Sequence, residues 1–377
     1  MSTRTLVRAA RWTTVLAAAA VLAAAGVGTA VADGPVSGTE GAVEVGADFA
    51  SPSISPDGAT AYVSVVEADR TVTVKAVDTR NGTVTGRVAL AGPKVVPVSA
   101  LSPDGTRLYV ANGRHLSVVD TATVTVVATA ELPDQQLPAG WSQGDARGLV
   151  VGPDGATVYV TQYGSWNTPQ YGPSRVLAYS TAQQRFTASV QLPDGGLTDP
   201  AAIGAPVLRP NGKDLYVGTR VGVVHLSTAS GTPAVVGTVP GTEKALEYDL
   251  ALTPDGTRLL AVGEDGHGQG DLIDPATDTV AKHVTLSGGA DQRLARSNAD
   301  GSRFYVSTYS ETDGPAVLSF DSATGAAVPG ETVTISEDQI TGIAAGPDGH
   351  TLYLGATSYV SNGDGLTLDA RLRIVSI

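Results

Sequence analysis

The fold is decided by one short stretch, Ser102-Pro103-Asp104-Gly105-Thr106-Arg107-Leu108-Tyr109-Val110-Ala111-Asn112, whose first part recurs along the chain. The phrase Pro-Asp-Gly, or a close variant, starts at Pro56, Pro103, Pro153, Pro210, Pro254, Ala299 and Pro347. Each copy predicts a tight turn between two strands, because proline presets φ at the second turn position and glycine closes the turn. The copies lie 44–57 residues apart, near the roughly 40 to 45 residues of a four-stranded propeller blade. The sequence predicts an all-β chain, a seven-bladed β-propeller with four-stranded blades.

The second repeat gives the order of strands within a blade. An inner strand at 97–101 enters the turn, a second strand at 107–111 returns, a third follows at 116–120, and an outer strand spans 124–131. Later third strands are expected at 175–179, 221–226, 271–274, 317–321 and 372–377. A single four-stranded sheet leaves both faces wet, so each blade needs neighbours to cover it.

Ring closure is predicted from the two ends of the repeat region. The last repeat has no fourth strand after 372–377, whereas an unassigned strand-like segment at 41–46 precedes the first inner strand. An unpaired edge between the first and last blades would be a liability. We therefore expect residues 41–46 to complete the seventh blade.

The N-terminus has the pattern of a secretory signal peptide. Arg4, Arg8 and Arg11 precede an apolar stretch at 15–27, and the small residues at 30–32 offer a cleavage site before Asp33. The apolar run is too short for a membrane span. We expect residues 1–32 to be a signal peptide, residues 33–377 to form the propeller, and the protein to be secreted and extracellular.

Composition narrows the partners and cofactors. The chain has 24 Lys and Arg against 37 Asp and Glu, for a formal net charge of −13, which disfavours nucleic acid and anionic lipid surfaces. It has no cysteine, which excludes disulfides and thiolate metal sites. Its five histidines show no metal-binding spacing. We expect no cofactor, no metal, no membrane span and a monomer.

Two phrases carry a family resemblance. Tyr109-Val110-Ala111-Asn112 and Tyr159-Val160-Thr161-Gln162 each follow a Pro-Asp-Gly turn, and a Val-Val-Asp-Thr-Ala-Thr phrase occupies 118–123. The mature chain thereby resembles the YVTN-repeat β-propeller family, which implies seven blades, frequent secretion and, for many members, no known activity. Architectural relatives include lactonases, lyases of the virginiamycin-B type and the heavy chain of quinoprotein amine dehydrogenases. The repeated residues themselves are interpreted as structural.

The repeats differ mainly at one end of the predicted propeller. What we call the turn end carries the Pro-Asp-Gly turns and the short links between third and fourth strands. What we call the loop end carries the links between second and third strands and between blades, and it holds almost every insertion. These insertions lie at 134–145, 162–174, 193–202, 241–249, 263–270, 310–314 and 358–365. Long loops on a rigid scaffold often bind ligands, so the loop end is the candidate functional face.

Aromatic residues single out two neighbouring insertions. Trp141 lies in the first, and Tyr163, Trp166 and Tyr171 lie in the second, while Tyr248 flanks another loop. Rings of this kind, beside Gln143, Gln162, Asn167 and Gln170, are typical of surfaces that bind a sugar or a protein. The alternative is that the rings bury one another as local mini-cores under the loops.

A second candidate site lies where the inner strands reach the central channel. The position six residues before each turn holds Ala50, Pro97, Arg147, Gly204, Tyr248, Arg293 and Thr341. Arg147 and Arg293 could hold a carboxylate or phosphate there, or could pair with the nearby Asp145, Asp249 and Asp291.

The predicted function is a secreted, non-catalytic binding module with a protein or carbohydrate ligand on the loop end and no catalytic residues. Its ligand-binding residues are predicted to be Trp141, Arg147, Tyr163, Trp166, Tyr171, Tyr248 and Arg293. The alternative is a lactonase- or lyase-like enzyme at the channel mouth that uses Arg147, Glu247, Asp249 and Arg293. The loop at 265–271 resembles a calcium loop only superficially, because its twelfth position is Ala276 rather than glutamate.

Overall fold

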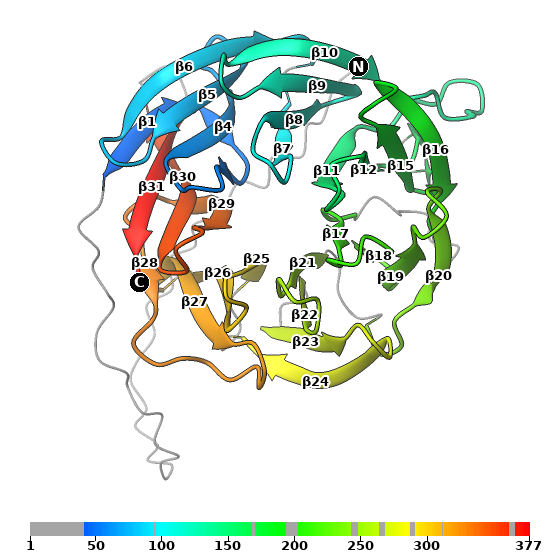
Figure 1. Cartoon of the computed structure of the whole chain (residues 1–377). Coiled ribbons are helices and arrows are strands. Elements are labelled where there is room, and N and C mark those ends of the chain that lie inside the picture. Colours follow the sequence, from blue (N-terminus) through cyan, green and yellow to red (C-terminus); the bar gives the residue numbers. More distant parts are fainter. Residues whose placement is uncertain are drawn as a thin grey trace, which may run out of the picture. The chain divides into compact units, whose positions relative to one another are not determined.

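The computed structural model describes residues 41–377 except 94, 168–169, 194–202, 243–247, 264–267, 287–290, 311 and 362–365. Within the strands, the side chains of residues 248, 291–293 and 366 are also outside the described part. Residues 1–40 lie outside it as well, so the signal peptide stays a prediction. The described residues are all β and form seven blades around a centre (Figure 1).

Blades 1 to 3 follow the predicted strand order. Blade 1 contains β2 (Asp48–Phe49), β3 (Ser53–Ile54), β4 (Thr60–Val66), β5 (Val72–Asp78) and β6 (Thr83–Leu90). Blade 2 contains β7 (Val98–Leu101), β8 (Arg107–Asn112), β9 (His115–Asp120) and β10 (Thr125–Glu131). Blade 3 contains β11 (Ala146–Val151), β12 (Thr157–Gln162), β15 (Arg175–Ser180) and β16 (Arg185–Gln191).

Blades 4 to 7 repeat the arrangement. Blade 4 contains β17 (Val207–Leu208), β18 (Asp214–Thr219), β19 (Gly222–Ser227) and β20 (Ala234–Thr238), and blade 5 contains β21 (Tyr248–Leu252), β22 (Leu259–Gly263), β23 (Gln269–Asp274) and β24 (Thr279–Thr285). Blade 6 contains β25 (Asp291–Ser297), β26 (Arg303–Ser310), β27 (Gly314–Asp321) and β28 (Val333–Thr334). Blade 7 contains β29 (Gln339–Ala345), β30 (Thr351–Ser361), β31 (Leu366–Ser376) and β1 (Ala42–Gly46).

The closing strand is confirmed. β1 pairs antiparallel with β31, Val43 lying opposite Leu372, so the first and last described strands lie side by side in one blade (Figure 1). Val43 and Val45 are buried in the cluster between blades 7 and 1.

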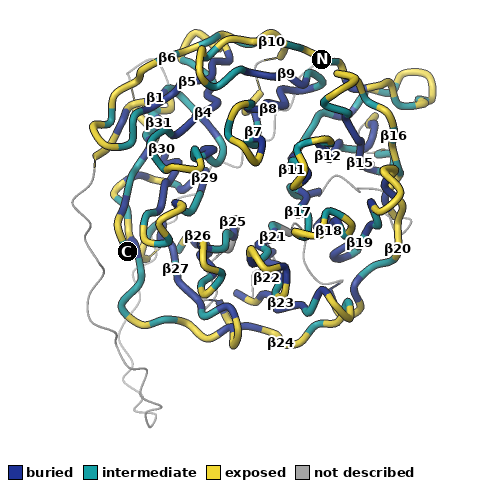
Figure 2. Tube along the Cα trace, viewed as in Figure 1, coloured by how far each residue is buried: buried dark blue, intermediate teal, exposed yellow. Residues whose placement is uncertain are grey.

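Apolar side chains gather between the blades. Among the described residues, one hydrophobic cluster lies at each of the seven blade-to-blade interfaces. Residues of the second and third strands are mostly buried, whereas along the outer strands more exposed and less exposed residues alternate (Figure 2). The repeated tyrosines belong to this core, since Tyr109, Tyr159, Tyr216, Tyr305 and Tyr353 are at most 4% exposed. Their structural interpretation is confirmed.

The Pro-Asp-Gly turns also join neighbouring blades. In each turn the glycine N–H donates to the carbonyl three residues earlier, as in Gly105 to Ser102 at 2.8 Å. The glycines lie at φ of +67° to +76°, which disfavours a side chain. A methyl group on Gly105 would lie 2.7 Å from Pro56 of the preceding blade, and equivalent contacts occur at five further interfaces. Only Gly349 has no such neighbour among the seven turns, because blade 6 carries Ala299 in place of proline.

Candidate functional site

The two insertions that carry tryptophan meet at the loop end of blade 3. Trp166–Asn167 (β13) pairs with Gln170–Tyr171 (β14), which places Trp166 opposite Tyr171. Ser142, next to Trp141, exchanges backbone hydrogen bonds of 2.8 and 3.0 Å with Trp166. Trp141, Trp166 and Tyr171 are therefore brought together, as the sequence predicted.

Their exposure divides these rings into two kinds. Trp166 is 45% exposed, whereas Trp141 and Tyr171 are half-buried. Trp166 thus presents its ring to solvent, while the other two also pack locally. The half-burial of Trp141 and Tyr171 agrees with the mini-core interpretation. A binding role for these rings stays a prediction.

A buried polar network fixes the two loops underneath. Gln135 Nε2 donates to the carbonyl of Tyr163 at 3.0 Å, and its Oε1 accepts from Gly144 N at 2.8 Å. Gln162 is fully buried; its Nε2 donates to the carbonyl of Gly144 at 2.6 Å, and its Oε1 accepts from Arg175 Nε at 2.7 Å. Arg175 also donates to the carbonyl of Pro133.

This network corrects part of the sequence interpretation. Gln162 supports the loops and does not face a ligand, and Gln143 is bonded to the backbone of Gln135 at 2.8 and 3.4 Å. Arg175 was missed, although an arginine inside an otherwise apolar third strand is the signal that could have revealed it. Burial, aided by the neighbouring Arg114, lowers the pKa of Arg175 from its usual value.

Arg147 lies at the channel beside this loop structure. Its guanidinium carbon is 4.4 Å from the centre of the Tyr163 ring, a cation–π contact. Tyr163 is half-buried and packs against the cluster between blades 3 and 4, so it acts as a support for Arg147. In the described part of the chain, no carboxylate forms an ion pair with Arg147.

For Tyr248 and Arg293, the two remaining predicted site residues, the structure describes only the backbone. Tyr248 begins β21, opposite Gly263, and Arg293 lies in β25 at a bulge between Gln292 and Leu294. Their side chains lie outside the described part, as do Glu247 and residues 264–267 of the loop first compared with a calcium site.

The central channel holds a cavity of about 880 Å³ lined by the inner strands of all seven blades. Ala50, Arg147, Gly204 and Thr341, four of the seven aligned channel positions, line it as predicted. Its other described charges are Asp249 and Arg296, which form an ion pair of 2.7 Å.

Arg296 ties the channel wall together. Its guanidinium also donates to Ser51 Oγ at 3.0 Å across to blade 1, and Ser51 Oγ accepts from Ile343 N of blade 7 at 3.1 Å. Asp249 additionally accepts from Ala295 N at 2.9 Å. The predicted pairing of Asp249 with Arg147 or Arg293 is wrong for Arg147, because Arg296 holds Asp249. Arg296 lies three residues before its turn, at a position where the other six repeats have a small or aliphatic residue. This difference is the sequence signal that could have revealed its role.

Carboxyl groups near the loop end are poorly solvated. Burial raises the pKa of Asp145 above its usual value, although Arg114 and Arg147 partly oppose the shift. Burial likewise raises the pKa of Asp48, against a backbone hydrogen bond from Phe49.

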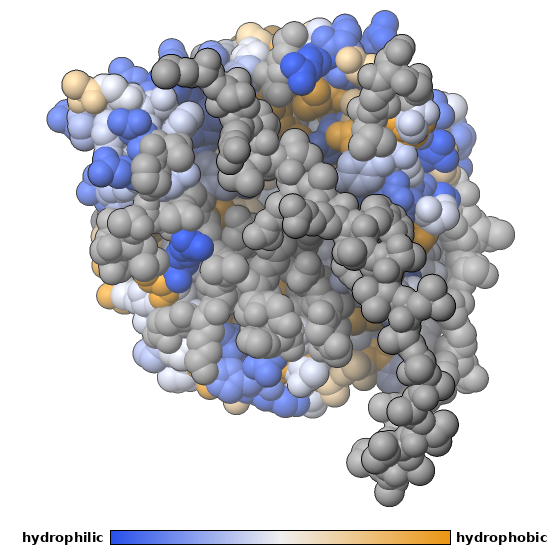
Figure 3. Space-filling model, turned by 180° about the vertical axis from the view of Figure 1, so that it is seen from behind, coloured by the Kyte–Doolittle hydropathy of each residue, from blue (hydrophilic) through white to orange (hydrophobic). Residues whose placement is uncertain are grey.

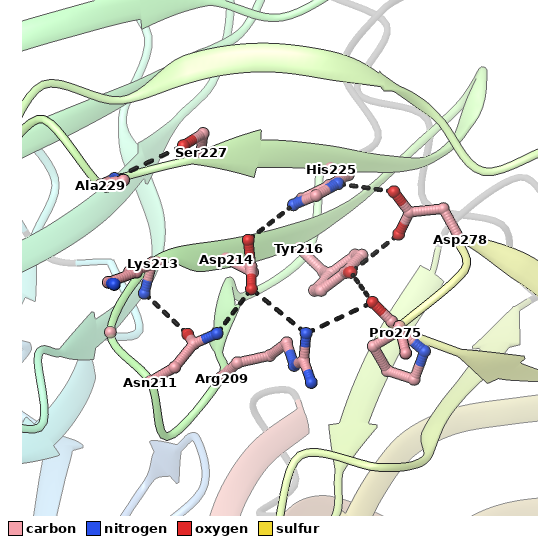
Figure 4. A network of polar contacts seen from close by, with 12 residues as sticks. Arg209, Asn211, Lys213, Asp214, Tyr216, His225, Ser227, Ala229, Pro275 and Asp278 are labelled. Carbon is pink, nitrogen blue, oxygen red and sulfur yellow. Dashed lines mark hydrogen bonds and ion pairs between the residues drawn. The ribbon is translucent and has the colours of Figure 1, made fainter.

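The turn end has its own polar network between blades 4 and 5 (Figure 4). His225 contacts Asp278 through Nδ1 at 2.7 Å and Asp214 through Nε2 at 3.3 Å, and it stacks on Tyr216. Tyr216 donates to Asp278 at 2.8 Å and to the carbonyl of Pro275 at 3.1 Å. The side chain of His225 is 13% exposed and joins blades 4 and 5.

Among the described residues, no group of three or more His, Asp or Glu side chains is arranged to hold a metal ion. No helix long and apolar enough to cross a membrane occurs in that part of the chain. On the side shown in Figure 3, exposed hydrophobic residues form separate groups among hydrophilic ones.

Comparisons with known proteins support the fold. No protein-family model matches the chain, so the resemblance to the YVTN-repeat family stays a prediction. A segment of 123 residues is 29% identical to the seven-bladed beta-propeller protein Rv1057 of Mycobacterium tuberculosis. The match spans 32% of this chain and 28% of that protein.

Two solved structures share the fold over most of the chain. Hydrazine synthase of Kuenenia stuttgartiensis is similar with a TM-score of 0.60 and 20% identity, covering 89% of this chain and 98% of that one. The Cps50 (Swd1) β-propeller domain of Myceliophteria thermophila is similar with a TM-score of 0.65 and 14% identity over the same shares. At these identities the likeness shows the propeller fold alone.

Proposed function

We propose that the protein is an extracellular, non-catalytic binding module that holds a protein or carbohydrate partner on its loop end. The observation that carries this proposal is the location of the exposed aromatic rings. Among the described residues these are Trp166, Tyr309 and Tyr359, which are 45%, 40% and 50% exposed. All three lie where a second strand meets a third, in blades 3, 6 and 7.

The chemistry of these positions fits a contact surface. A tryptophan or tyrosine ring offers a large apolar area and a polar group at little cost in side-chain entropy, which is why such rings anchor interfaces. Blade 7 adds apolar area, because Tyr359 and Leu368 are paired across the β30–β31 hairpin and both are exposed.

The outer rim offers a useful contrast. Its exposed apolar residues are valines on outer strands, including Val127 and Val236 at 49% and 58%. These valines occur as single residues or adjacent pairs on separate outer strands, and small exposed apolar groups of this kind are ordinary on a protein surface.

Secretion forms part of the proposal and rests on the sequence of residues 1–32. Sequencing the N-terminus of the protein recovered outside the cell tests it. A mature protein starting at Asp33 is expected, and a protein retained inside with Met1 intact would contradict it.

Binding is tested by a glycan array and a pull-down with the mature protein, repeated with the triple variant Trp166→Ala, Tyr309→Ala and Tyr359→Ala. The triple variant should lose the captured ligand while keeping its melting temperature. The matched control, Val127→Ala with Val236→Ala, removes exposed apolar area on the rim and should leave capture unchanged.

Two results would overturn this function. One is capture that survives the triple variant unchanged. The other is turnover in a lactone-hydrolysis screen that Arg147→Gln abolishes, which would favour the channel-mouth enzyme.

A further inference from the structure

We propose that the central channel is a second site, separate from the loop-end surface, which binds a small organic monocarboxylate with an apolar body through Arg147. The site goes beyond the proposed partner surface and does not depend on it.

The cavity has the size and composition of a small-molecule site. Its volume of about 880 Å³ lies within the range of roughly 300 to 1,000 Å³ for ligand pockets. Its apolar wall includes Leu149, Val207, Leu250, Leu294 and Ile343, from five different blades. Such a wall favours a ligand with a hydrocarbon or aromatic body.

The charge in the cavity points to an anion. Of its three described ionisable side chains, Asp249 and Arg296 neutralise each other at 2.7 Å. Arg147 forms no ion pair with a carboxylate in the described part of the chain. The nearest interacting carboxyl is Asp145, whose pKa is raised by burial despite the opposing effect of Arg147. In a chain of net charge −13, an arginine that lines a cavity without an ion pair in the described part is a specific feature.

The orientation of Arg147 suits a carboxylate. The ring of Tyr163 covers one face of the guanidinium at 4.4 Å, which leaves the in-plane N–H groups available. Those groups form the fork that binds a carboxylate through two parallel hydrogen bonds. Among the described lining residues, Arg147 is the one cation without an ion pair, and a single negative charge matches it. A dianion would leave a second charge beside apolar walls.

Arg296 acts as a positioning residue for this site. Its bonds to Asp249 and to Ser51 Oγ hold blades 5, 6 and 1 together around the channel. Both Nη atoms of Arg296 are already hydrogen-bonded to Asp249 and Ser51. We therefore assign the contact with the ligand to Arg147.

The experiment measures binding of benzoate, cyclohexanecarboxylate and octanoate by isothermal titration calorimetry, with benzamide, cyclohexanecarboxamide and octanamide as neutral counterparts. At least one carboxylate should bind while its amide does not. Arg147→Gln should weaken that binding about 10- to 100-fold, the effect of losing a charge-assisted hydrogen-bond pair. Arg147→Lys should recover only part of it, because lysine keeps the charge but not the fork.

The matched control is Arg185→Gln, which removes an exposed arginine from the outer strand of the same blade and should leave binding unchanged. Trp166→Ala should also leave it unchanged, so failure of the channel site and failure of the loop-end surface are distinguishable. The proposal is overturned if none of the carboxylates binds, if amides bind equally well, or if Arg147→Gln and Arg185→Gln behave alike.

Discussion

The turn end and the loop end are built from the same strands, yet the pKa values of their aspartates are shifted in opposite directions. At the turn end, the pKa is lowered for Asp57, Asp104, Asp120, Asp214, Asp255, Asp300, Asp321 and Asp348. Toward the loop end, burial raises the pKa of Asp48 and Asp145.

The contrast has a simple physical basis. In the turn of blade 2, the side-chain hydroxyl of Ser102 and the backbone N–H and hydroxyl of Thr106 donate to Asp104 at 2.5, 3.0 and 2.9 Å. The turn end therefore uses its charges to hold the repeat together. The loop end keeps poorly solvated carboxylates and exposed rings that nothing in the repeat requires, which is typical of a functional surface.

The largest expected effect tests whether the ring that supports both ends is closed as described. Removing residues 33–47 deletes β1 together with the buried Val43 and Val45, and it leaves β31 as a free edge. We expect the melting temperature to fall by about 10 °C or more, or the protein to aggregate, because each buried valine contributes about 1.5 to 3 kcal/mol. A control truncation of residues 33–40 leaves β1 intact. Equal melting of both truncations would contradict the closure.

Asp104→Ala tests the stabilising role of the turn end. Hydrogen bonds from Ser102 and Thr106 lower the folded-state pKa of this exposed carboxyl. Its stabilising effect is therefore present above its unfolded pKa, near 3.9, and is lost as pH falls through the lower folded value. We expect a melting temperature about 2 °C lower at pH 7, with the difference closing below pH 4. A difference in melting temperature between variant and wild type that is the same at pH 7 and at pH 3 would show that ionised Asp104 is not what stabilises the turn.

Ala299→Pro tests the contacts between turns. Proline suits the second position of this turn, where the other six repeats have it, and it would also restore the missing contact with Gly349. Such a change typically adds about 0.4 to 1 kcal/mol by restricting the unfolded chain. Differential scanning calorimetry should show a rise of about 1 to 2 °C, against a decrease for Ala299→Gly. A lower melting temperature for Ala299→Pro would show that blade 6 departs from the common turn.

Asp145→Asn gives the smallest expected effect and the opposite sign from Asp104→Ala. Because burial raises its folded-state pKa, the ionised carboxyl destabilises the fold once pH rises above its unfolded pKa, near 3.9. The variant should melt about 1 °C higher at pH 7 and like the wild type near pH 3. Asp134→Asn, which removes an ion pair of 2.7 Å with Arg114, should give no gain. If Asp145→Asn instead lowers the melting temperature at pH 7, the ionised Asp145 does not destabilise the fold.

The sequence was sufficient to predict the features that every repeat shares. It was also sufficient where one repeat clearly differs from the others, through a missing strand or a long insertion. The closing strand followed from a missing fourth strand. The pairing of the two insertions that carry Trp141 and Trp166 followed from their adjacent places in the repeat. Contacts between blades were not predictable in the same way. The packing of Gly105 on Pro56 requires the ring to be assembled first.

Side-chain direction was the other limit. The bulge between Gln292 and Leu294 shifts the register of β25, and Arg296, which the sequence analysis did not single out, holds Asp249. Gln162 was interpreted as a ligand contact because its loop is long, but it ends a buried strand and its amide satisfies the backbone beneath that loop.

The most direct test of the division between the two ends is a paired measurement of melting temperature and partner affinity for Trp166→Ala and Asp104→Ala, using the ligand captured by the wild type. Trp166→Ala should weaken binding more than tenfold with its melting temperature unchanged within about 1 °C, because the ring is exposed and lies outside the blade strands. Asp104→Ala should lower the melting temperature and leave affinity unchanged. A Trp166→Ala variant that melts several degrees lower and binds as tightly as the wild type would contradict the account, since the ring would then be part of a local core.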